Sequence, residues 1–355
     1  MTMALLDPPL ALRIADLGDT ADCARIDDFV RAHRGTPFHC TGWSRAVERG
    51  CGQRAHYLVA ETAAGAIAGV LPTNAVRSPL FGAALVSAGF AVDGGVLGGD
   101  AALGPLSRAA WALAEQLRCP TLELRGGPVP GDGWQVDETT YVGFARDLAA
   151  DDAAQLTAIP RKQRAEVRKA LAHDFEIAIG NDAAAARAHY AVYAESVRNL
   201  GTPVFPAALF RAMLDQFGNA ADVLTVRHQG RAVASVLSFY VNDTVYPYWG
   251  GGTFEARGLR ANDAMYYALM CHARSRGCTR FDFGRSKIGT GAAAFKKNWG
   301  FDPEPLAYAV RTADGAAKRE INPLSPRYRL QVRVWQKLPL WLANFMGPWI
   351  AKGLG

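Results

Sequence analysis

Arg276-Gly-Cys-Thr-Arg-Phe-Asp-Phe-Gly284 is the stretch that decides the fold, because it closes a helical pattern (264–274) and enters a strand. An earlier stretch, Leu117-Arg-Cys-Pro-Thr-Leu-Glu-Leu-Arg125, follows a helical pattern at 106–117 and does the same, with the two cysteines in register. Two such matches in one chain indicate an internal repeat. Coincidence is the alternative, since a helix followed by a strand is common.

Matching hairpins are predicted upstream of both stretches. Gly65-Ala-Ile-Ala-Gly-Val-Leu71 follows a turn at 63–65, and Arg231-Ala-Val-Ala-Ser-Val-Leu237 follows a turn at 228–230. Short apolar or alternating runs entered from such turns are typical of β-hairpins. Each half is therefore predicted to contain a helix, a strand, a turn, two strands, a helix and a strand, ending in a βαβ crossover.

The predicted fold class is α/β, with two tandem domains whose mixed sheets are flanked by helices. A length of 355 residues suits two domains. The first is expected at 1–150, up to an acidic, Ala-rich joint, and the second at 151–312. Residues 313–326 have the glycine and prolines of a linker, so 313–355 is predicted to be a linker and a tail.

Composition limits the compartment and the partners. The chain has 39 Lys and Arg against 33 Asp and Glu, a net charge of +6, which favours anionic partners such as phosphates, tRNA or an anionic membrane face. Its six cysteines form no CxxC pair and no Cys/His cluster, so reduced cytosolic thiols and no metal are predicted. The start of the chain is not a signal peptide pattern, and no apolar run is long enough to span a bilayer.

The second domain carries the most specific motifs. A strand ending in Phe281-Asp-Phe-Gly284 is followed by a glycine loop and by Phe295-Lys-Lys-Asn-Trp-Gly-Phe301. Upstream, a strand at 222–228, a hairpin and Tyr246-Pro-Tyr-Trp-Gly-Gly-Gly252 follow the order of a GNAT-type acyltransferase core. These motifs resemble those of the FemAB family of duplicated GNAT-like proteins. The basic stretch at 159–169 also looks like the entry to the second domain of that family.

This resemblance covers most of residues 10–312 and is closest to the FemAB-like subgroup associated with exosortase/PEP-CTERM and exopolysaccharide systems. The family moves an amino acid from aminoacyl-tRNA onto the amine of a peptidoglycan precursor. The resemblance therefore implies an aminoacyl or acyl transferase that forms an amide on a cell-envelope or exopolysaccharide precursor. It also implies two tandem GNAT-like domains and a cytoplasmic protein working at the inner membrane face.

Two departures from the family pattern concern the substrates. A lysine that contacts precursor phosphate in some members has no match beyond Trp43, which leaves the acceptor open. A CoA-dependent GNAT enzyme needs a Q/R-x-x-G-x-G/A loop for the pyrophosphate, whereas residues 254–262 have a single glycine. We therefore expect no CoA and no other cofactor. The alternatives are a GNAT N-acyltransferase that uses an acyl thioester and a non-catalytic protein that binds glycan or lipid-linked intermediates.

Lys296 is the first predicted catalytic residue. Acyl transfer passes through an oxyanion, and a preorganised cation beside it is usually the largest catalytic contribution. Lys296 is expected on a short helix capped by Gly300, with Phe295 and Trp299 on the buried face. The alternative is a solvated surface lysine.

Asp282 is the second predicted catalytic residue. It alternates with Phe281 and Phe283, so it should face away from them and could accept a proton from the attacking ammonium or orient it. The alternative is a structural cap or an ion pair with Arg285 or Arg280.

Six residues are predicted to bind substrate: Arg161, Arg164, Arg198, Tyr248, Trp249 and Arg285. The first two could bind phosphate or form a solvated charged face. Arg198 is expected on a loop at a helix end. The two aromatic residues could floor a substrate groove or pack in the core.

The tail combines aromatic and basic residues. Trp335, Trp341, Phe345 and Trp349 lie among arginines and lysines, and prolines divide the segment into short pieces. Peripheral contact with the inner membrane is one interpretation, and packing on the second domain or on a partner chain is the other.

Overall fold

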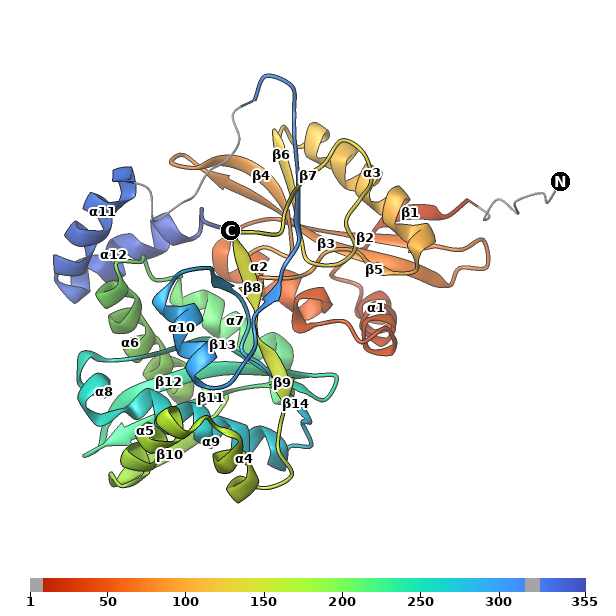
Figure 1. Ribbon diagram of the computed structural model, residues 1–355. Helices are drawn as coiled ribbons and strands as arrows, with labels where there is room; N and C mark the ends of the chain where they lie inside the picture. Colours follow the sequence, from red (N-terminus) through yellow and green to blue (C-terminus); the bar gives the residue numbers. More distant parts are fainter. Residues whose placement is uncertain (1–8, 317–325) are drawn as a thin grey trace. The chain divides into compact units, whose positions relative to one another are not determined.

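The computed structural model of the protein describes residues 9–316 and 326–355 (Figure 1). The chain forms two compact units. Unit 1 contains the described residues 9–138, 307–316 and 353–355, and unit 2 contains 139–306 and 326–352. Each unit is an α/β fold with a mixed sheet, as the sequence predicts.

The sheet of unit 1 has one parallel pair. Its strands run in the order β1 (Ala11–Ile14), β2 (Ala55–Glu61), β3 (Ile67–Ser78), β4 (Gly82–Ser87), β6 (Thr121–Arg125), β17 (Tyr308–Thr312) and β7 (Gln135–Asp137), with β5 (Leu97–Gly98) on β3. The helices are α1 (Thr20–Ala32), η1 (Pro37–His39), α2 (Thr41–Cys51) and α3 (Asp100–Gln116). Only β4 and β6 are parallel, and α3 is the crossover between them.

The main sheet of unit 2 repeats this pattern. Its order is β10 (Phe175–Gly180), β11 (Ala221–His228), β12 (Arg231–Val241), β13 (Thr244–Gly252), β14 (Arg280–Asp282) and β9 (Ala145–Asp147). The helices that precede β14 in the chain are α4 (Asp152–Ala158), α5 (Arg161–Leu171), α6 (Ala183–Leu200), α7 (Ala207–Phe217), η2 (Gly218–Ala220), α8 (Phe254–Leu259) and α9 (Ala261–Ser275). The last two form the crossover from β13 to β14. Again one pair is parallel, β13 with β14.

Further elements of unit 2 follow β14. A small sheet has the order β15 (Ser286–Lys287), β8 (Tyr141–Gly143) and β16 (Glu304–Pro305), and α10 (Gly291–Asn298) lies in the chain between β15 and β16. Two last helices, α11 (Pro326–Lys337) and α12 (Leu340–Ala351), pack against α6. The predicted linker at 313–326 falls mostly outside the described residues.

The internal repeat is confirmed by topology. In both units the first strand after the crossover helix is entered through a left-handed residue, Arg118 (φ 53°) or Gly277 (φ 86°). The next residue is a buried cysteine whose amide closes the helix: Cys119 N–H donates to Ala114 O at 2.8 Å, and Cys278 N–H donates to the equivalent carbonyl at 3.0 Å. The two cysteines therefore occupy equivalent strand entrances.

The unit boundaries differ from those predicted at 150 and 312. Unit 1 takes its sixth strand, β17, from the chain after unit 2, and unit 2 takes its sixth strand, β9, from the chain before its first helix. Each pairs antiparallel with the strand that follows the crossover. Strands of three to five residues have too little alternation to be assigned from sequence, so each sixth strand was placed in the wrong half.

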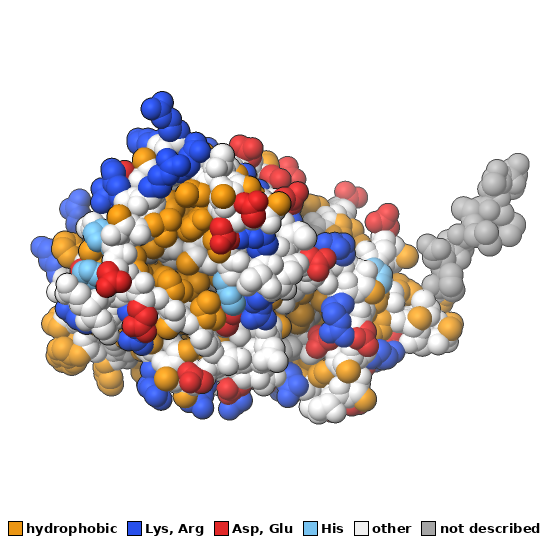
Figure 2. Space-filling view, turned by 90° about the horizontal axis from the view of Figure 1, so that it is seen from below, with side chains coloured by type: hydrophobic (Ala, Val, Ile, Leu, Met, Phe, Trp, Pro, Cys, Tyr) orange, Lys and Arg blue, Asp and Glu red, His pale blue; other side chains and the backbone are white. Residues whose placement is uncertain are grey.

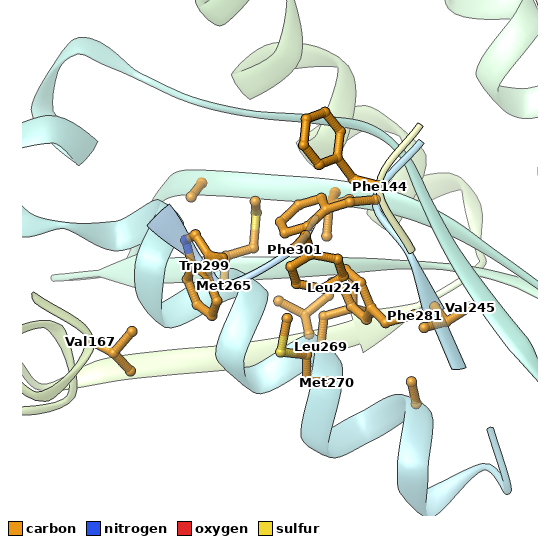
Figure 3. Close-up of a cluster of buried hydrophobic side chains, with 14 of the residues drawn as sticks. Phe144, Val167, Leu224, Val245, Met265, Leu269, Met270, Phe281, Trp299 and Phe301 are labelled. Carbon is orange, nitrogen blue, oxygen red and sulfur yellow. The ribbon is translucent and has the colours of Figure 1, made fainter. Parts of the chain in front are cut away.

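The core of unit 2 lies between its sheet and α9. Figure 3 shows Met265 and Leu269 from α9 against Phe281 of β14, with Trp299 and Phe301 from the segment after α10. All five of these side chains are buried. The predicted alternation along β14 is confirmed, because the two phenylalanines around Asp282 point into this core.

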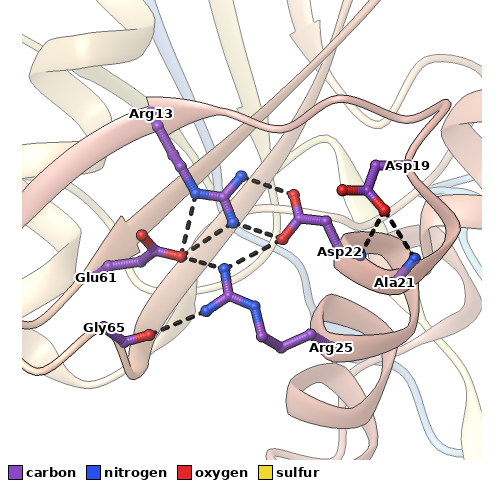
Figure 4. Close-up of polar contacts among 7 residues, drawn as sticks. All are labelled: Arg13, Asp19, Ala21, Asp22, Arg25, Glu61 and Gly65. Carbon is purple, nitrogen blue, oxygen red and sulfur yellow. Dashed lines mark hydrogen bonds and ion pairs between the residues drawn. The ribbon is translucent and has the colours of Figure 1, made fainter.

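A cluster of ion pairs and hydrogen bonds joins α1 to the edge strands β1 and β2 of unit 1 (Figure 4). Arg13 on β1 makes a two-pronged hydrogen bond to Asp22 on α1, with both distances 2.7 Å, and donates from Nε to Glu61 on β2 at 3.1 Å. Arg25 joins the same carboxylates and donates to Gly65 O at 2.9 Å. Bidentate arginine–carboxylate pairs fix geometry as well as charge, so this cluster sets how α1 lies on the edge strands.

The chain has more basic than acidic residues, and basic side chains are prominent on part of its surface. Figure 2 shows Lys and Arg side chains gathered at one end of the face it displays, next to exposed hydrophobic side chains. Within the described part of the chain, no helix has both the length and the apolar character needed to cross a membrane.

Candidate functional site

The candidate site lies at the carboxyl end of β14 in unit 2. β13 and β14 pair at only two positions, Thr244 with Arg280 and Val245 with Phe281, although β13 continues to Gly252. Parallel strands that separate in this way leave backbone groups free of sheet partners. Ligands of open α/β sheets bind at such carboxyl ends.

Helix α10 is fixed beside this strand end at both of its own ends. β15 before it and β16 after it pair with the same strand, β8. Thr290 caps the start of the helix, accepting from the amide of Ala293 at 3.4 Å. Gly300 (φ 83°) ends it: its amide donates to Lys297 O at 2.9 Å, and the amide of Phe301 donates to Lys296 O at 3.3 Å. This Schellman arrangement confirms the predicted glycine cap.

The side chain of Lys296 turns back from α10 to the end of β14. Its Nζ donates to Gly284 O at 3.0 Å and to Arg285 O at 2.9 Å. The rings of Phe144 and Phe283 lie 5.4 and 5.8 Å from the nitrogen. Lys296 is therefore a largely enclosed amine rather than a solvated surface lysine.

Burial lowers the pKa of Lys296 to about 7, while Asp282 opposes that shift and Arg285 adds to it. In either protonation state, two N–H groups are available for the two carbonyls. The remaining position on Nζ carries a third N–H when the amine is charged and a lone pair when it is neutral. Lys296 can thus present either a donor or a base near neutral pH.

Asp282 and Arg285 lie beside this amine. Asp282 accepts from the amide of Gly284 at 2.7 Å, so its carboxylate caps the turn that brings Gly284 O to Lys296. The guanidinium of Arg285 stacks 4.4 Å over the ring of Tyr141. Asp282 thus has a structural contact of the kind considered from sequence, and its position next to Lys296 also suits a catalytic contribution.

Sequence reasoning missed Phe144 and Tyr141 on the other side of the site. Phe144 is fully buried, and its carbonyl accepts from the amide of Phe283 at 2.7 Å. No local signal marks either residue, because the chain separates them from Lys296 by about one hundred and fifty residues.

Other predicted binding residues lie elsewhere in unit 2. Trp249 is buried, and its ring packs at 5.2 Å against Phe210 and at 4.7 Å against Tyr248, which favours the core interpretation of Trp249. Arg198 lies in the last turn of α6, not on a loop, and donates to Gln336 O of α11 at 3.3 Å. Neither has a described contact with Lys296.

The two arginines of α5 lie nearer to α10. A side-chain carbon at Gly300, the end of α10, would come within 3.0 Å of Pro160, the residue before α5. Arg161 is exposed and Arg164 is half-buried, and both have no ion pair or hydrogen bond to another side chain within the described residues. Their side chains are available to an anion near this end of α10.

The start of α9, where a GNAT enzyme would hold a pyrophosphate, has an acidic residue in its first turn. α8 occupies the preceding stretch, and Arg260 there is paired with Glu166. Asp263 in the first turn of α9 accepts from Gln163 at 2.6 Å, and burial raises its pKa to about 6. A phosphate at this helix terminus would meet the carboxyl group of Asp263, whereas Glu166 is already paired with Arg260 and Lys169.

Across residues 9–316 and 326–355, no three His, Cys, Asp or Glu side chains are grouped so as to hold a metal ion.

Comparison with known proteins identifies the fold. Residues 160–297 match the family described as an acetyltransferase (GNAT) domain. The crystal structure of FemX has a TM-score of 0.66 at 15% identity, covering 84% of this chain and 96% of that one. L-PGS from Bacillus licheniformis has a TM-score of 0.55 at 13% identity, covering 90% of this chain and 98% of that one.

A tandem GNAT protein from the clavulanic acid biosynthesis pathway has a TM-score of 0.53 at 14% identity, covering 87% of this chain and all of that one. No curated protein sequence is significantly similar to the chain. The chain therefore shares its fold with FemX and with the tandem GNAT protein, and residues 160–297 match a GNAT domain.

Proposed function

We propose that the protein is an acyl- or aminoacyltransferase that forms an amide on an amine of a cell-envelope or exopolysaccharide precursor, with aminoacyl-tRNA as donor. The observation that carries this proposal is Lys296, an enclosed amine held by two carbonyls at the carboxyl end of β14. The FemX-like fold and the FemAB-like motifs at 281–301 support the same class of reaction.

In the proposed reaction, the amine nitrogen of the acceptor attacks the acyl carbon of the donor ester. A C–N bond forms, the C–O bond to the tRNA ribose breaks, and the proton lost by the amine goes to the ribose oxygen directly or through a base. The third N–H of charged Lys296 stabilises the oxyanion. Asp282 takes a proton from the ammonium of the acceptor, which frees the lone pair that attacks, or orients the amine so formed. Arg285 is proposed to contact the donor or acceptor from the same strand end.

Two features support tRNA rather than CoA as the donor. The single glycine of residues 254–262 and the carboxyl group of Asp263 in the first turn of α9 disfavour a pyrophosphate there. Arg161 and Arg164, beside the end of α10, suit the phosphates of an acceptor stem. The substrate-binding role of Arg198, Tyr248 and Trp249 is not needed for this proposal.

A second candidate is an N-acyltransferase that takes an acyl thioester from a carrier protein. The match of residues 160–297 to an acetyltransferase domain favours it. The same Lys296 would then stabilise a thioester-derived oxyanion.

The experiment offers both donors to the same protein. Total tRNA charged with radiolabelled amino acids, acetyl-CoA, and an acyl carrier protein are each incubated with amine-bearing envelope precursors, using the wild type and Lys296→Met. We expect label to move from tRNA to the precursor only with the wild type. Consumption of a thioester in place of charged tRNA would establish the second candidate, and consumption of no donor would contradict both.

A further inference from the structure

Helix α12 buries its small residues and exposes its large ones. Ala343, Gly347 and Ala351, spaced four apart, are buried. A side-chain carbon at Gly347 would lie 3.0 Å from Val204, in the segment after α6, so this face packs closely on the body of unit 2. This packing fixes which face of α12 points outward.

The outward face is aromatic. Trp341, Phe345 and Trp349 are also spaced four apart, and they are 71%, 70% and 71% exposed. An amphipathic helix of a water-soluble domain normally does the reverse, with its large apolar residues against the core and polar ones in water. The arrangement of α12 therefore calls for an apolar surface outside the described chain.

The charges of residues 326–355 have a single sign. Helix α12 has no charged residue, while residues 326–355 contain five Lys or Arg and no Asp or Glu. On α11, Leu330 and Val334 are exposed beside the exposed Arg333 and Lys337. At the other end, Lys352 Nζ lies 4.6 Å from the ring of Trp349.

We propose that α11 and α12 form a docking surface for an anionic lipid bilayer, with both helices lying in the headgroup region. Large aromatic rings with basic residues at their borders match an apolar interior covered by negative headgroups. Tryptophan suits this depth, because its ring is apolar and its N–H remains in the polar layer. Neither helix is long enough to cross the bilayer.

A second copy of the chain fits the same surface less well. A twofold interface would bring the basic residues of α11 against their own equivalents, without an acidic residue in the segment to pair with them. An anionic membrane supplies that charge. The proposal is independent of the acyl donor.

The test is cosedimentation of the full chain with phosphatidylcholine vesicles, with and without phosphatidylglycerol. We expect binding to the anionic vesicles that weakens as salt rises. The variant with Trp341→Ala, Phe345→Ala and Trp349→Ala should bind at least about tenfold more weakly. Phe254→Ala, which removes an equally exposed ring (73%) from α8, is the matched control and should bind like the wild type.

A second variant protects the test against misfolding. Arg333→Glu with Lys337→Glu should weaken binding to anionic vesicles by a similar factor, whereas Arg211→Glu on α7 should not. Circular dichroism shows which variants stay folded. Lys296→Met should bind vesicles like the wild type, which separates this proposal from the transferase.

Two outcomes would overturn the proposal. One is a wild type that binds neither vesicle. The other is a wild-type dimer, seen by analytical ultracentrifugation, that the aromatic variant converts to a monomer without a change in vesicle binding, because the surface would then serve a second copy.

Discussion

The ends of β6 and β14 are equivalent positions in the two units, but the charged residues at the two ends make different contacts. Aligned on their cysteines, Glu123 corresponds to Asp282 and Arg125 corresponds to Gly284. In unit 1, Arg125 is buried, pairs with Glu123 at 2.7 Å and donates to Ala91 O at 2.9 Å. The cation at this strand end therefore fastens the surrounding loop.

In unit 2 the cation comes from another element. Gly284 has no side chain at the position of the arginine, and its carbonyl accepts from Lys296 of α10 instead. The carboxylate of Asp282 accepts from the backbone amide of Gly284 and supports the charge of Lys296. The same strand end thus holds a structural ion pair in one unit and a perturbed amine in the other.

The strands that pair in parallel with β6 and β14, which are β4 and β13, also differ between the two units. β4 ends at Ser87, whose Oγ accepts from the amide of Arg125 at 2.8 Å, and the chain then turns over the strand end. Gly95 in that turn lies so close to Gly126 O that a side chain at Gly95 would clash. β13 instead continues to Gly252. The chain thus crosses this strand end closely in unit 1, whereas in unit 2 the strand end receives the amine of Lys296.

The largest expected effect is on catalysis in unit 2. Lys296→Met should lower kcat by on the order of a hundredfold or more, because it removes the donor to the oxyanion, while donor binding changes little. Methionine keeps the long stem between Phe144 and Phe283, but the carbonyls of Gly284 and Arg285 lose their donor. The melting temperature should therefore fall by about a few degrees, and kcat is compared per folded molecule.

Lys297→Met is the control for Lys296→Met, because Lys297 is exposed on the same helix. Equal losses from both variants would indicate general attraction of an anionic donor, and no loss from Lys296→Met in a working assay would exclude it from the mechanism.

The next effect is on the stability of unit 1. Arg125→Met should lower the free energy of unfolding by about 3 kcal/mol, because it leaves Glu123 and two buried carbonyls without their cation. Denaturant titration measures this loss. The turnover per folded molecule should stay near that of the wild type, and a loss as large as that of Lys296→Met would show that unit 1 contributes to the chemistry.

A smaller loss of stability is expected from a substitution at the glycine-rich end of β13. A side chain at Gly251 would clash with Ser196 on α6, so Gly251→Ala should cost about 2 kcal/mol by overpacking. Gly258→Ala on α8 is the control, since nothing lies within 4 Å of its added carbon. A neutral Gly251→Ala, measured by thermal unfolding, would mean that α6 can move away from this strand end.

The sequence predicted the features that depend on local pattern. The repeat, the Gly300 cap and the shared buried face of Phe295 and Trp299 all follow from the period of the elements and from glycine geometry. The sequence leaves open whether Lys296 is enclosed, because Lys-Lys on a short helix also has the pattern of a solvated face. Phe144, which covers it, comes from a distant segment.

The last prediction concerns pH and uses the equivalent carboxylates. The pKa of Lys296 is about 7, below its ordinary value, because of burial. If the charged amine stabilises the oxyanion, kcat should fall as pH rises through this pKa. Asp282→Asn removes the charge that supports the ammonium, so the falling limb should move to lower pH by about one unit.

Glu123→Gln makes the same chemical change at the equivalent position of unit 1, where the neighbouring cation is Arg125 instead of a lysine. This variant should leave the pH at which kcat falls unchanged. A limb that rises with pH would mean that Lys296 acts as a neutral base, with its lone pair at the third position of Nζ. A limb shifted equally by both variants would show that the pH dependence reflects the charge of the whole protein. Because the two carboxylates differ in their cation, only a shift confined to Asp282→Asn assigns the titration to the pair formed by Asp282 and Lys296.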